Sequence, residues 1–133
     1  LELEKDLALV LDIHHHWIRD EEYIEAKDDR VKRVIDSWRG QRPTLHYSYS
    51  RDEHLAVADL GDKTHTQMHD IKDLLARGCK KQKLRAHSDL LPNRAVNDWA
   101  LSFSENFDIQ TEAKGKNMAQ EQLYRQAKET AVI

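Results

Sequence analysis

The segment Leu9-Val10-Leu11-Asp12-Ile13-His14-His15-His16 joins a nearly continuous aliphatic run to side chains that bind metals. Such a run is typical of a parallel strand covered on both faces, so we predict a strand over residues 7–13. Three further segments, 42–48, 84–89 and 107–114, each combine a predicted strand with His, Asp or Glu. Buried strands rarely keep such residues unless they are paired or gathered around a ligand.

Amphipathic patterns separate these strands. Apolar residues at helical spacing predict helices over residues 20–38, 64–77 and 117–130, and another after Pro92-Asn93. The alternation of strand and helix, four times along the chain, predicts an α/β fold with parallel strands. No repeat or linker marks a boundary, so we expect residues 1–133 to form a single partial domain of about four strand–helix units.

The predicted strands have one polar and one apolar face. Because side chains alternate along a strand, His46 lies opposite Leu45 and Tyr47, and Glu112 shares its face with Asp108. A doubly wound sheet would need both faces apolar. The asymmetry instead favours a barrel of parallel strands whose lumen opens onto a site at the strand C-termini.

Composition limits the class of protein. The chain has 133 residues, of which 39% are hydrophobic and 34% charged, so we expect a small globular unit with a modest core. The single cysteine, Cys79, excludes an internal disulfide, and no apolar run approaches the ~18 residues of a membrane helix. The acidic start is unlike a signal peptide, so we expect a cytoplasmic protein without a membrane partner. The net charge of −3 argues weakly against nucleic acid, although bound divalent cations would add roughly +4 to +6 around a site.

The candidate site residues each have a structural alternative. Asp12 and His15 fit a solvated turn equally well, and His46 fits a core histidine. His87, taken alone, is somewhat better explained as a loop residue. Glu112 is the strongest candidate because a buried carboxylate needs a cation or proton partner. Taken together, the four segments are explained more simply by a metal site.

Neighbouring residues refine this hypothesis. Lys114 offers a purely structural ion pair to Glu112 as the alternative. At most one or two of three consecutive imidazoles can face one point, so we expect His14 and His16 to lie beside the ligands or to face DNA. A basic run precedes the third site segment and could contact phosphates, although a solvated loop is the more frequent explanation. It consists of Lys80, Lys81, Lys83 and Arg85.

The donor types indicate the chemistry. Imidazole and carboxylate without thiolate suit manganese, zinc or iron better than calcium. Such ions lower the pKa of bound water and neutralise charge on a phosphoryl oxygen. The chain has no Gly-x-Ser-x-Gly elbow and no Gly-x-Gly phosphate loop, so neither serine-hydrolase chemistry nor a glycine-rich nucleotide site is supported.

In order along the chain, five motifs resemble the C-terminal half of the UV damage endonucleases. The motifs are 9–16, Asp36-Ser37-Trp38-Arg39, His46-Tyr47-Ser48, His87-Ser88-Asp89 and Glu112-Ala113-Lys114-Gly115-Lys116-Asn117. The resemblance implies half of a TIM (β/α)8 barrel related to endonuclease IV and the sugar isomerases. It also implies a cluster of divalent metal ions, manganese first and zinc second, and nicking of damaged double-stranded DNA on the 5′ side of UV photoproducts.

The resemblance also assigns roles to residues. The implied metal ligands are Asp12, His15, His46, His87 and Glu112. The implied catalytic group is Glu112, His46 and Lys114.

Because a full member needs about twice this length, we expect this chain alone to be inactive and to self-associate through open barrel edges. The alternatives are a metal-dependent sugar isomerase or epimerase, an endonuclease IV-like barrel, and a half barrel without catalytic activity.

Overall fold

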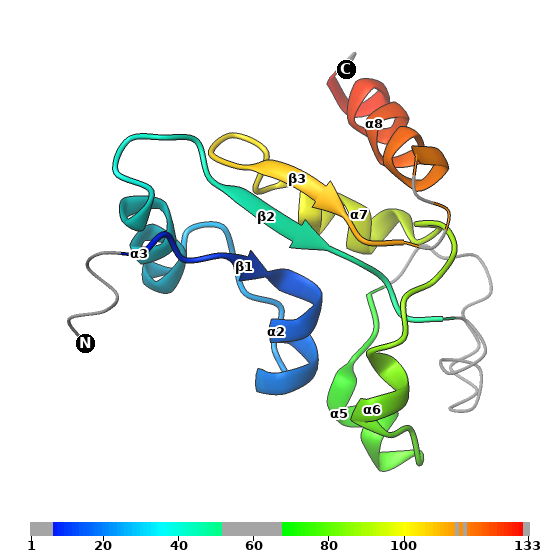
Figure 1. Cartoon of the computed structure of the whole chain (residues 1–133). Helices are drawn as coiled ribbons and strands as arrows, with labels where there is room; N and C mark the ends of the chain where they lie inside the picture. The colour runs from blue at the N-terminus through cyan, green and yellow to red at the C-terminus, as the bar shows by residue number, and fades with distance from the viewer. Residues whose placement is uncertain (1–6, 52–67, 114, 116, 132–133) are drawn as a thin grey trace.

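A computed structural model of the chain describes residues 7–51, 68–113, 115 and 117–131, and its centre is a three-stranded parallel sheet (Figure 1). The strands are β1 (Leu11–Asp12), β2 (Thr44–Tyr47) and β3 (Asp108–Thr111), in the order β1-β2-β3. Both pairings are parallel, which confirms the α/β prediction. The described strands form an open sheet that is consistent with part of a TIM-like barrel, and they do not close a barrel.

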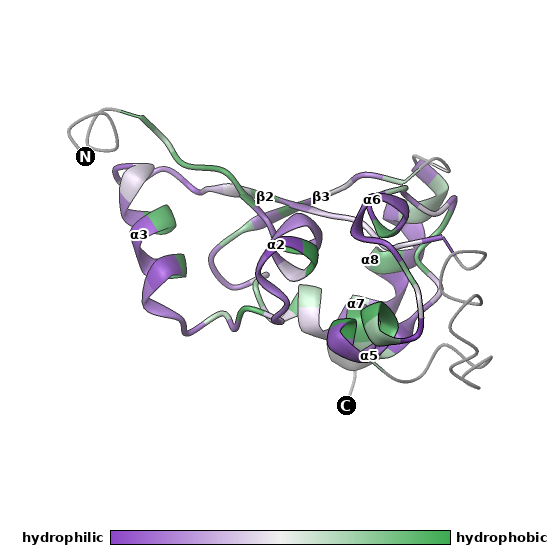
Figure 2. Cartoon of the chain, turned by 90° about the horizontal axis from the view of Figure 1, so that it is seen from below, coloured by the Kyte–Doolittle hydropathy of each residue, from purple (hydrophilic) through white to green (hydrophobic). Residues whose placement is uncertain are grey.

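Six helices of the described residues accompany the sheet. They are α2 (Ile13–Asp20), α3 (Asp29–Ser37), α5 (Ile71–Ala76), α6 (Lys81–Leu84), α7 (Arg94–Leu101) and α8 (Asn117–Ala131). Figure 2 shows α2, α3 and α7 on one side of the strands, while α5 and α6 lie beyond the strand C-termini in Figure 1.

The two faces of the sheet differ as the alternation predicts. Leu45 and Tyr47 are fully buried in the core, whereas His46 between them remains partly exposed. On β3, Asp108 and Gln110 are exposed. The apolar face therefore packs against the helices, and the polar face of β2 and β3 stays accessible.

The first predicted strand is wrong in its length. β1 ends at Asp12, because the Asp12 side chain accepts a hydrogen bond from the backbone N–H of His15 at 2.8 Å and caps α2. The histidine run therefore lies on a helix. The helix predicted over 20–38 is wrong in its first half, since α2 ends with Glu21 in the left-handed conformation and α3 starts only after its own cap, Asp28.

The third predicted strand is wrong. Residues 81–84 form a short helix in which the N–H of Leu84 donates to the carbonyl of Lys80 at 3.1 Å. The segment beyond it forms only an isolated antiparallel bridge between His87 and Ser50. Leu84 is fully buried, as the apolar pattern predicts, but it belongs to the buried side of a helix and not to a strand.

The remaining predictions differ mainly at their ends. The helix predicted over 64–77 is confirmed as α5 over 71–76, and residues 64–67 lie outside the described part. The fourth strand is confirmed over the shorter range 108–111, and the helix predicted over 117–130 matches α8 closely.

Candidate functional site

His46 and Glu112 come together at the C-terminal ends of the parallel strands. His46 lies on β2, and the backbone N–H of Glu112 donates to the carbonyl of Tyr47 at 2.8 Å, which extends the pairing beyond β3. Nδ1 of His46 is 3.1 Å from Oε1 of Glu112, and the two side chains are 31% and 33% exposed. Two residues far apart in sequence therefore form a solvent-accessible imidazole–carboxylate pair.

Asp12 lies beside this pair in the sheet. It is the register partner of His46, so the two residues occupy adjacent strands at the same level. One oxygen of its carboxylate caps α2 through the N–H of His15. The imidazole of His15 is exposed on the first turn of α2. The spacing between Asp12 and His15 is thus explained at least in part by helix capping.

The loop that carries His87 crosses close to the ends of β2 and β3. The N–H of Ser88 donates to the carbonyl of Tyr49 at 2.8 Å, and the N–H of Gly115 donates to the carbonyl of Asp89 at 2.6 Å. A Cβ atom at Gly115 would collide with that carbonyl oxygen, so this approach requires glycine. The motifs around 87–89 and 112–117 are therefore in direct contact through their backbones.

His14 and His16 lie in the interior, whereas the prediction placed them either beside the metal ligands or facing DNA. His14 is buried, with Nδ1 2.9 Å from Oγ of Ser48 and Nε2 3.0 Å from Oγ of Ser50. Burial lowers the pKa of His14 from 6.5 to about 4, against the opposing effect of the Asp12 carboxylate. The neutral ring is held by hydroxyl groups, which indicates a structural role.

His16 is buried between two carboxylates. Its Nδ1 is 2.9 Å from Asp20 and its Nε2 is 2.9 Å from Glu22. A hydrogen bond from Arg19 lowers the pKa of Asp20, and one from His16 lowers the pKa of Glu22. Of the two alternatives predicted for His14 and His16, the one in which they face DNA is therefore wrong, because both rings are buried.

Sequence reasoning missed Ser50 as a partner of His14. The signal was the alternation Tyr47-Ser48-Tyr49-Ser50, in which small polar and large aromatic residues continue past the end of β2. All four of these residues are buried. Buried hydroxyl groups need hydrogen-bond partners, so this alternation pointed to polar contacts in the interior.

The predicted DNA-binding run surrounds α6. Nζ of Lys81 donates to the carbonyl of Arg19 at 3.2 Å and lies 3.8 Å from Oε2 of Glu21, so it holds α6 against the end of α2. Its three companions, Lys80, Lys83 and Arg85, are exposed. DNA contact by this run stays a prediction. Lys114, a predicted catalytic residue, lies outside the described residues.

The side chains at this site are of types that bind metal ions, but their positions in the described structure do not form a metal site. His46 and Glu112 offer nitrogen and carboxylate oxygen, which suit manganese or zinc. Within the described ranges, however, no three His, Cys, Asp or Glu side chains lie close enough together to hold a metal ion. Asp12, His15 and His87 are thus not gathered with the pair in this structure, and the five-residue metal site stays a prediction.

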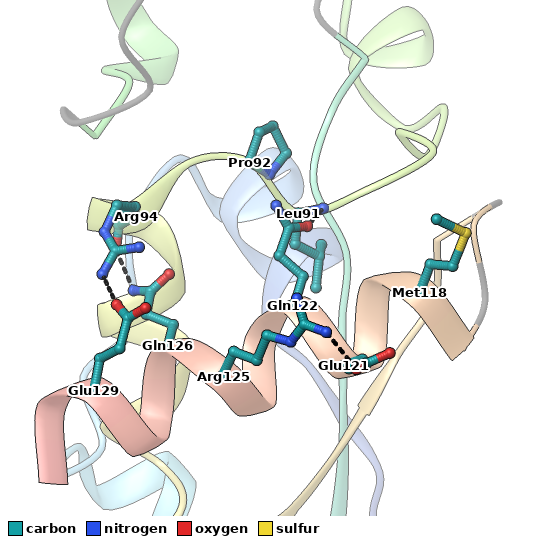
Figure 3. Close-up of a pocket in the computed structure, with 9 residues that line it drawn as sticks. All are labelled: Leu91, Pro92, Arg94, Met118, Glu121, Gln122, Arg125, Gln126 and Glu129. Atoms are coloured by element: carbon teal, nitrogen blue, oxygen red, sulfur yellow. Dashed lines mark hydrogen bonds and ion pairs between the residues drawn. The ribbon is translucent and has the colours of Figure 1, made fainter. Parts of the chain in front are cut away.

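A separate pocket lies between α7 and α8 (Figure 3). Its volume is about 380 Å³, and two ion pairs of 2.7 Å cross or border it, Arg94 with Glu129 and Arg125 with Glu121. None of the predicted site residues lines it. The pocket is therefore distinct from the strand-end site.

No described helix has the length and apolar character needed to span a membrane.

Comparison with known proteins places the chain in a family. Neither the search of curated proteins nor that of solved structures found a match. The family model described as UV-endonuclease UvdE matches residues 2–133, nearly the whole chain. The chain therefore belongs to the UV-endonuclease UvdE family.

Proposed function

We propose that this chain forms part of the active site of a DNA repair endonuclease that hydrolyses the phosphodiester bond 5′ to UV photoproducts. The family match over residues 2–133 supports the reaction class. The observation that carries the location is the contact between His46 and Glu112 at the strand C-termini, with Asp12 in register beside them. Active sites of parallel barrels lie at this end of the strands.

The contact between His46 and Glu112 favours one tautomer of the imidazole. A carboxylate beside Nδ1 stabilises a proton on that nitrogen, which leaves the Nε2 lone pair to bind a metal ion or accept a proton. Both side chains are about one-third exposed, so a DNA phosphate can approach them. We propose Lys114, two residues further along the sequence and outside the described residues, as a third catalytic group.

Divalent metal ions complete the proposal. Asp12, His15, His46, His87 and Glu112 would hold them, with manganese as the first candidate and zinc as the second. The bound ions would supply an activated water and neutralise charge on the phosphoryl oxygens. Damaged double-stranded DNA is the proposed partner, and its backbone would meet the exposed basic residues around α6.

The test is a nicking assay on supercoiled plasmid with and without UV irradiation. We expect the 133-residue chain alone to nick at background level, and a fusion to the first half of a homologous barrel to nick irradiated plasmid only. EDTA should abolish this activity and manganese restore it. A folded, metal-replete fusion that leaves irradiated plasmid intact would contradict the endonuclease proposal and favour a sugar isomerase. Damage-specific nicking by the chain alone would show that further barrel units are not required.

We also propose that the chain self-associates through the outer edges of its sheet. In the structure, side chains cover part of each edge. At β3, the N–H of Thr111 donates to Oε1 of Gln120 at 3.2 Å, and Nε2 of Gln120 donates to the carbonyl of Ile109 at 3.3 Å. At the β1 side, Nε1 of Trp38 donates to the carbonyl of Leu9 at 2.8 Å. Side-chain groups thus occupy positions that a neighbouring strand would use.

Removal of the β3 cover should increase self-association. Gln120→Ala exposes the N–H of Thr111 and the carbonyl of Ile109, so we expect a larger dimer or oligomer fraction than in the unmodified chain. Sedimentation velocity at matched concentrations measures the difference. Gln122→Ala, on the same helix, is the control, because the side chain of Gln122 accepts a hydrogen bond from the N–H of Leu91 at 2.7 Å and not from β3. Equal distributions for all three proteins would show that this edge does not mediate association.

A further inference from the structure

Basic side chains without a partner gather around α6. Most arginine and lysine side chains of the described residues are engaged, as in the ion pairs of Arg42 with Asp108 at 2.7 Å and of Arg77 with Asp73 at 3.1 Å. Within the described ranges, the basic residues whose side chains make no hydrogen bond, ion pair or ring contact are Lys27, Lys72, Lys80, Lys83 and Arg85, and all of them are exposed. The last three lie on α6 or directly beside it.

Lys81 is engaged on the inner side of the same helix. Its Nζ donates to the carbonyl of Arg19 at 3.2 Å and lies 3.8 Å from Oε2 of Glu21, so its charge has an anionic partner and its side chain ties α6 to the end of α2. Leu84 is fully buried, and its carbonyl accepts a hydrogen bond from Oγ of Ser50 at 2.7 Å. Helix α6 is therefore fixed on one side, while its other basic side chains are exposed.

Helix α6 lies at the end of the sheet that carries the candidate site. It stands beyond the strand C-termini (Figure 1), the end at which His46 meets Glu112. Arg85 precedes His87 by two residues, and His87 forms a bridge to Ser50 after β2. A polyanion approaches a chain of net charge −3 most favourably where unpaired cations are concentrated. The exposed cations around α6 provide such a place beside the site.

We propose that α6 is a docking element for the phosphate backbone of duplex DNA, with Lys80, Lys83 and Arg85 as phosphate contacts and Lys81 as the residue that positions the helix. The proposal rests on the endonuclease function above and divides the basic run, because Lys81 is committed to α2. Phosphate contacts carry no sequence information. Docking on α6 therefore requires neither a photoproduct nor a metal ion.

The test is the salt dependence of DNA binding by the full chain, measured by fluorescence anisotropy with a labelled duplex in the presence of EDTA. Each phosphate contact contributes about 0.9 to the slope of log Kobs against log salt concentration. We expect Lys83→Ala to reduce the magnitude of this slope by about 0.9, and the triple variant Lys80→Ala, Lys83→Ala, Arg85→Ala to reduce it by about 2.7. The reductions should be equal on irradiated and undamaged duplexes.

Two control variants remove one lysine charge each without removing a proposed phosphate contact. Lys27→Ala removes an exposed lysine that lies near Glu105 and Phe107, just before β3 begins, and therefore at the opposite end of the strands. Lys81→Ala removes the lysine that is committed to α2. Both variants should keep the slope of the unmodified chain, and circular dichroism checks that every variant is folded.

A reduction for Lys27→Ala or Lys81→Ala as large as that for Lys83→Ala would overturn the proposal, because binding would then follow the total charge. An unmodified chain that does not bind the duplex at low salt would overturn it as well. The endonuclease proposal fails separately. Reduced slopes without nicking by the fusion would contradict the endonuclease function alone, whereas nicking of irradiated plasmid with unchanged slopes would contradict docking on α6 alone.

Discussion

Two histidines of this chain meet polar partners in opposite settings. His14 lies in the interior between Ser48 and Ser50, and burial holds its pKa near 4. His46 lies at the strand ends against Glu112, with about one-third of each side chain exposed. Both residues sit close to a β-strand terminus, yet only His46 pairs with a carboxylate that solvent, a metal ion or DNA can reach.

The comparison shows how a histidine with a structural role differs from one that can bind a further partner. The hydroxyl partners of His14 are themselves buried and hydrogen-bonded, so the ring is committed to the interior. The contact between His46 and Glu112 is open and leaves Nε2 for another partner. Changes at the first site should therefore alter stability, and changes at the second should alter activity.

The largest expected effect is on catalysis. Glu112→Gln in the fusion protein removes the charge beside His46 while keeping the shape of the side chain. We expect the rate of nicking to fall at least about 100-fold. A displacement of a metal ion or catalytic group by only about 1 Å can lower a reaction rate by that factor. The rate on UV-irradiated plasmid measures the loss, and circular dichroism checks the fold.

Glu105→Gln is the matched control for this experiment. Glu105 is an exposed carboxylate between α7 and β3, and its described contact uses only its backbone carbonyl, which accepts from Arg42. Its substitution should leave nicking unchanged. Full activity in Glu112→Gln would remove Glu112 from the mechanism.

The next effect is on stability at the buried site. His14→Ala leaves a cavity and takes the partner from Ser48 and Ser50, so we expect the free energy of unfolding to fall by about 2–4 kcal/mol. Urea denaturation of the full chain measures it. The neighbouring His15→Ala, at an exposed position, should stay within about 0.5 kcal/mol. Similar losses for both variants would contradict the structural role of His14.

Acid should weaken the same site. The pKa of His14 is about 4 in the folded chain and 6.5 in the unfolded one, so between these values only the unfolded chain takes up the proton. Stability from this group is complete above pH 6.5 and falls as the pH drops towards 4, by at most about 3 kcal/mol at 1.36 kcal/mol per pKa unit. His14→Gln should lack this part of the pH dependence. Parallel curves for the two proteins would refute the assignment.

The smallest effect is on stability at the strand-end site. His46→Gln breaks a contact that is one-third exposed, and such pairs contribute about 0–1 kcal/mol. We therefore expect a change in unfolding free energy below about 1 kcal/mol, measured by the same urea denaturation, together with loss of nicking in the fusion. A loss of stability as large as that of His14→Ala would mean that His46 also has a structural role.

Periodic and local signals in the sequence were sufficient for much of the fold. The alternation of strand and helix predicted parallel strands, the alternation around Leu45 and Tyr47 identified the buried face of β2, and the pattern over 117–130 located α8. The motifs from residues 9 to 117 also identified the family that the model over residues 2–133 confirms. These features repeat within a few residues, so they can be read without knowledge of distant contacts.

Contacts between distant segments settled what the sequence left open. Residues 84–88 have the apolar content of a short strand, but packing of Leu84 and the bridge from His87 to Ser50 make them a helix end and a loop. The pairing of His46 with Glu112, and of His14 with Ser48 and Ser50, joins segments that no local period relates. A histidine beside a strand end looks the same in sequence whether it is buried or accessible, because burial and hydrogen-bond partners arise only when the chain has folded.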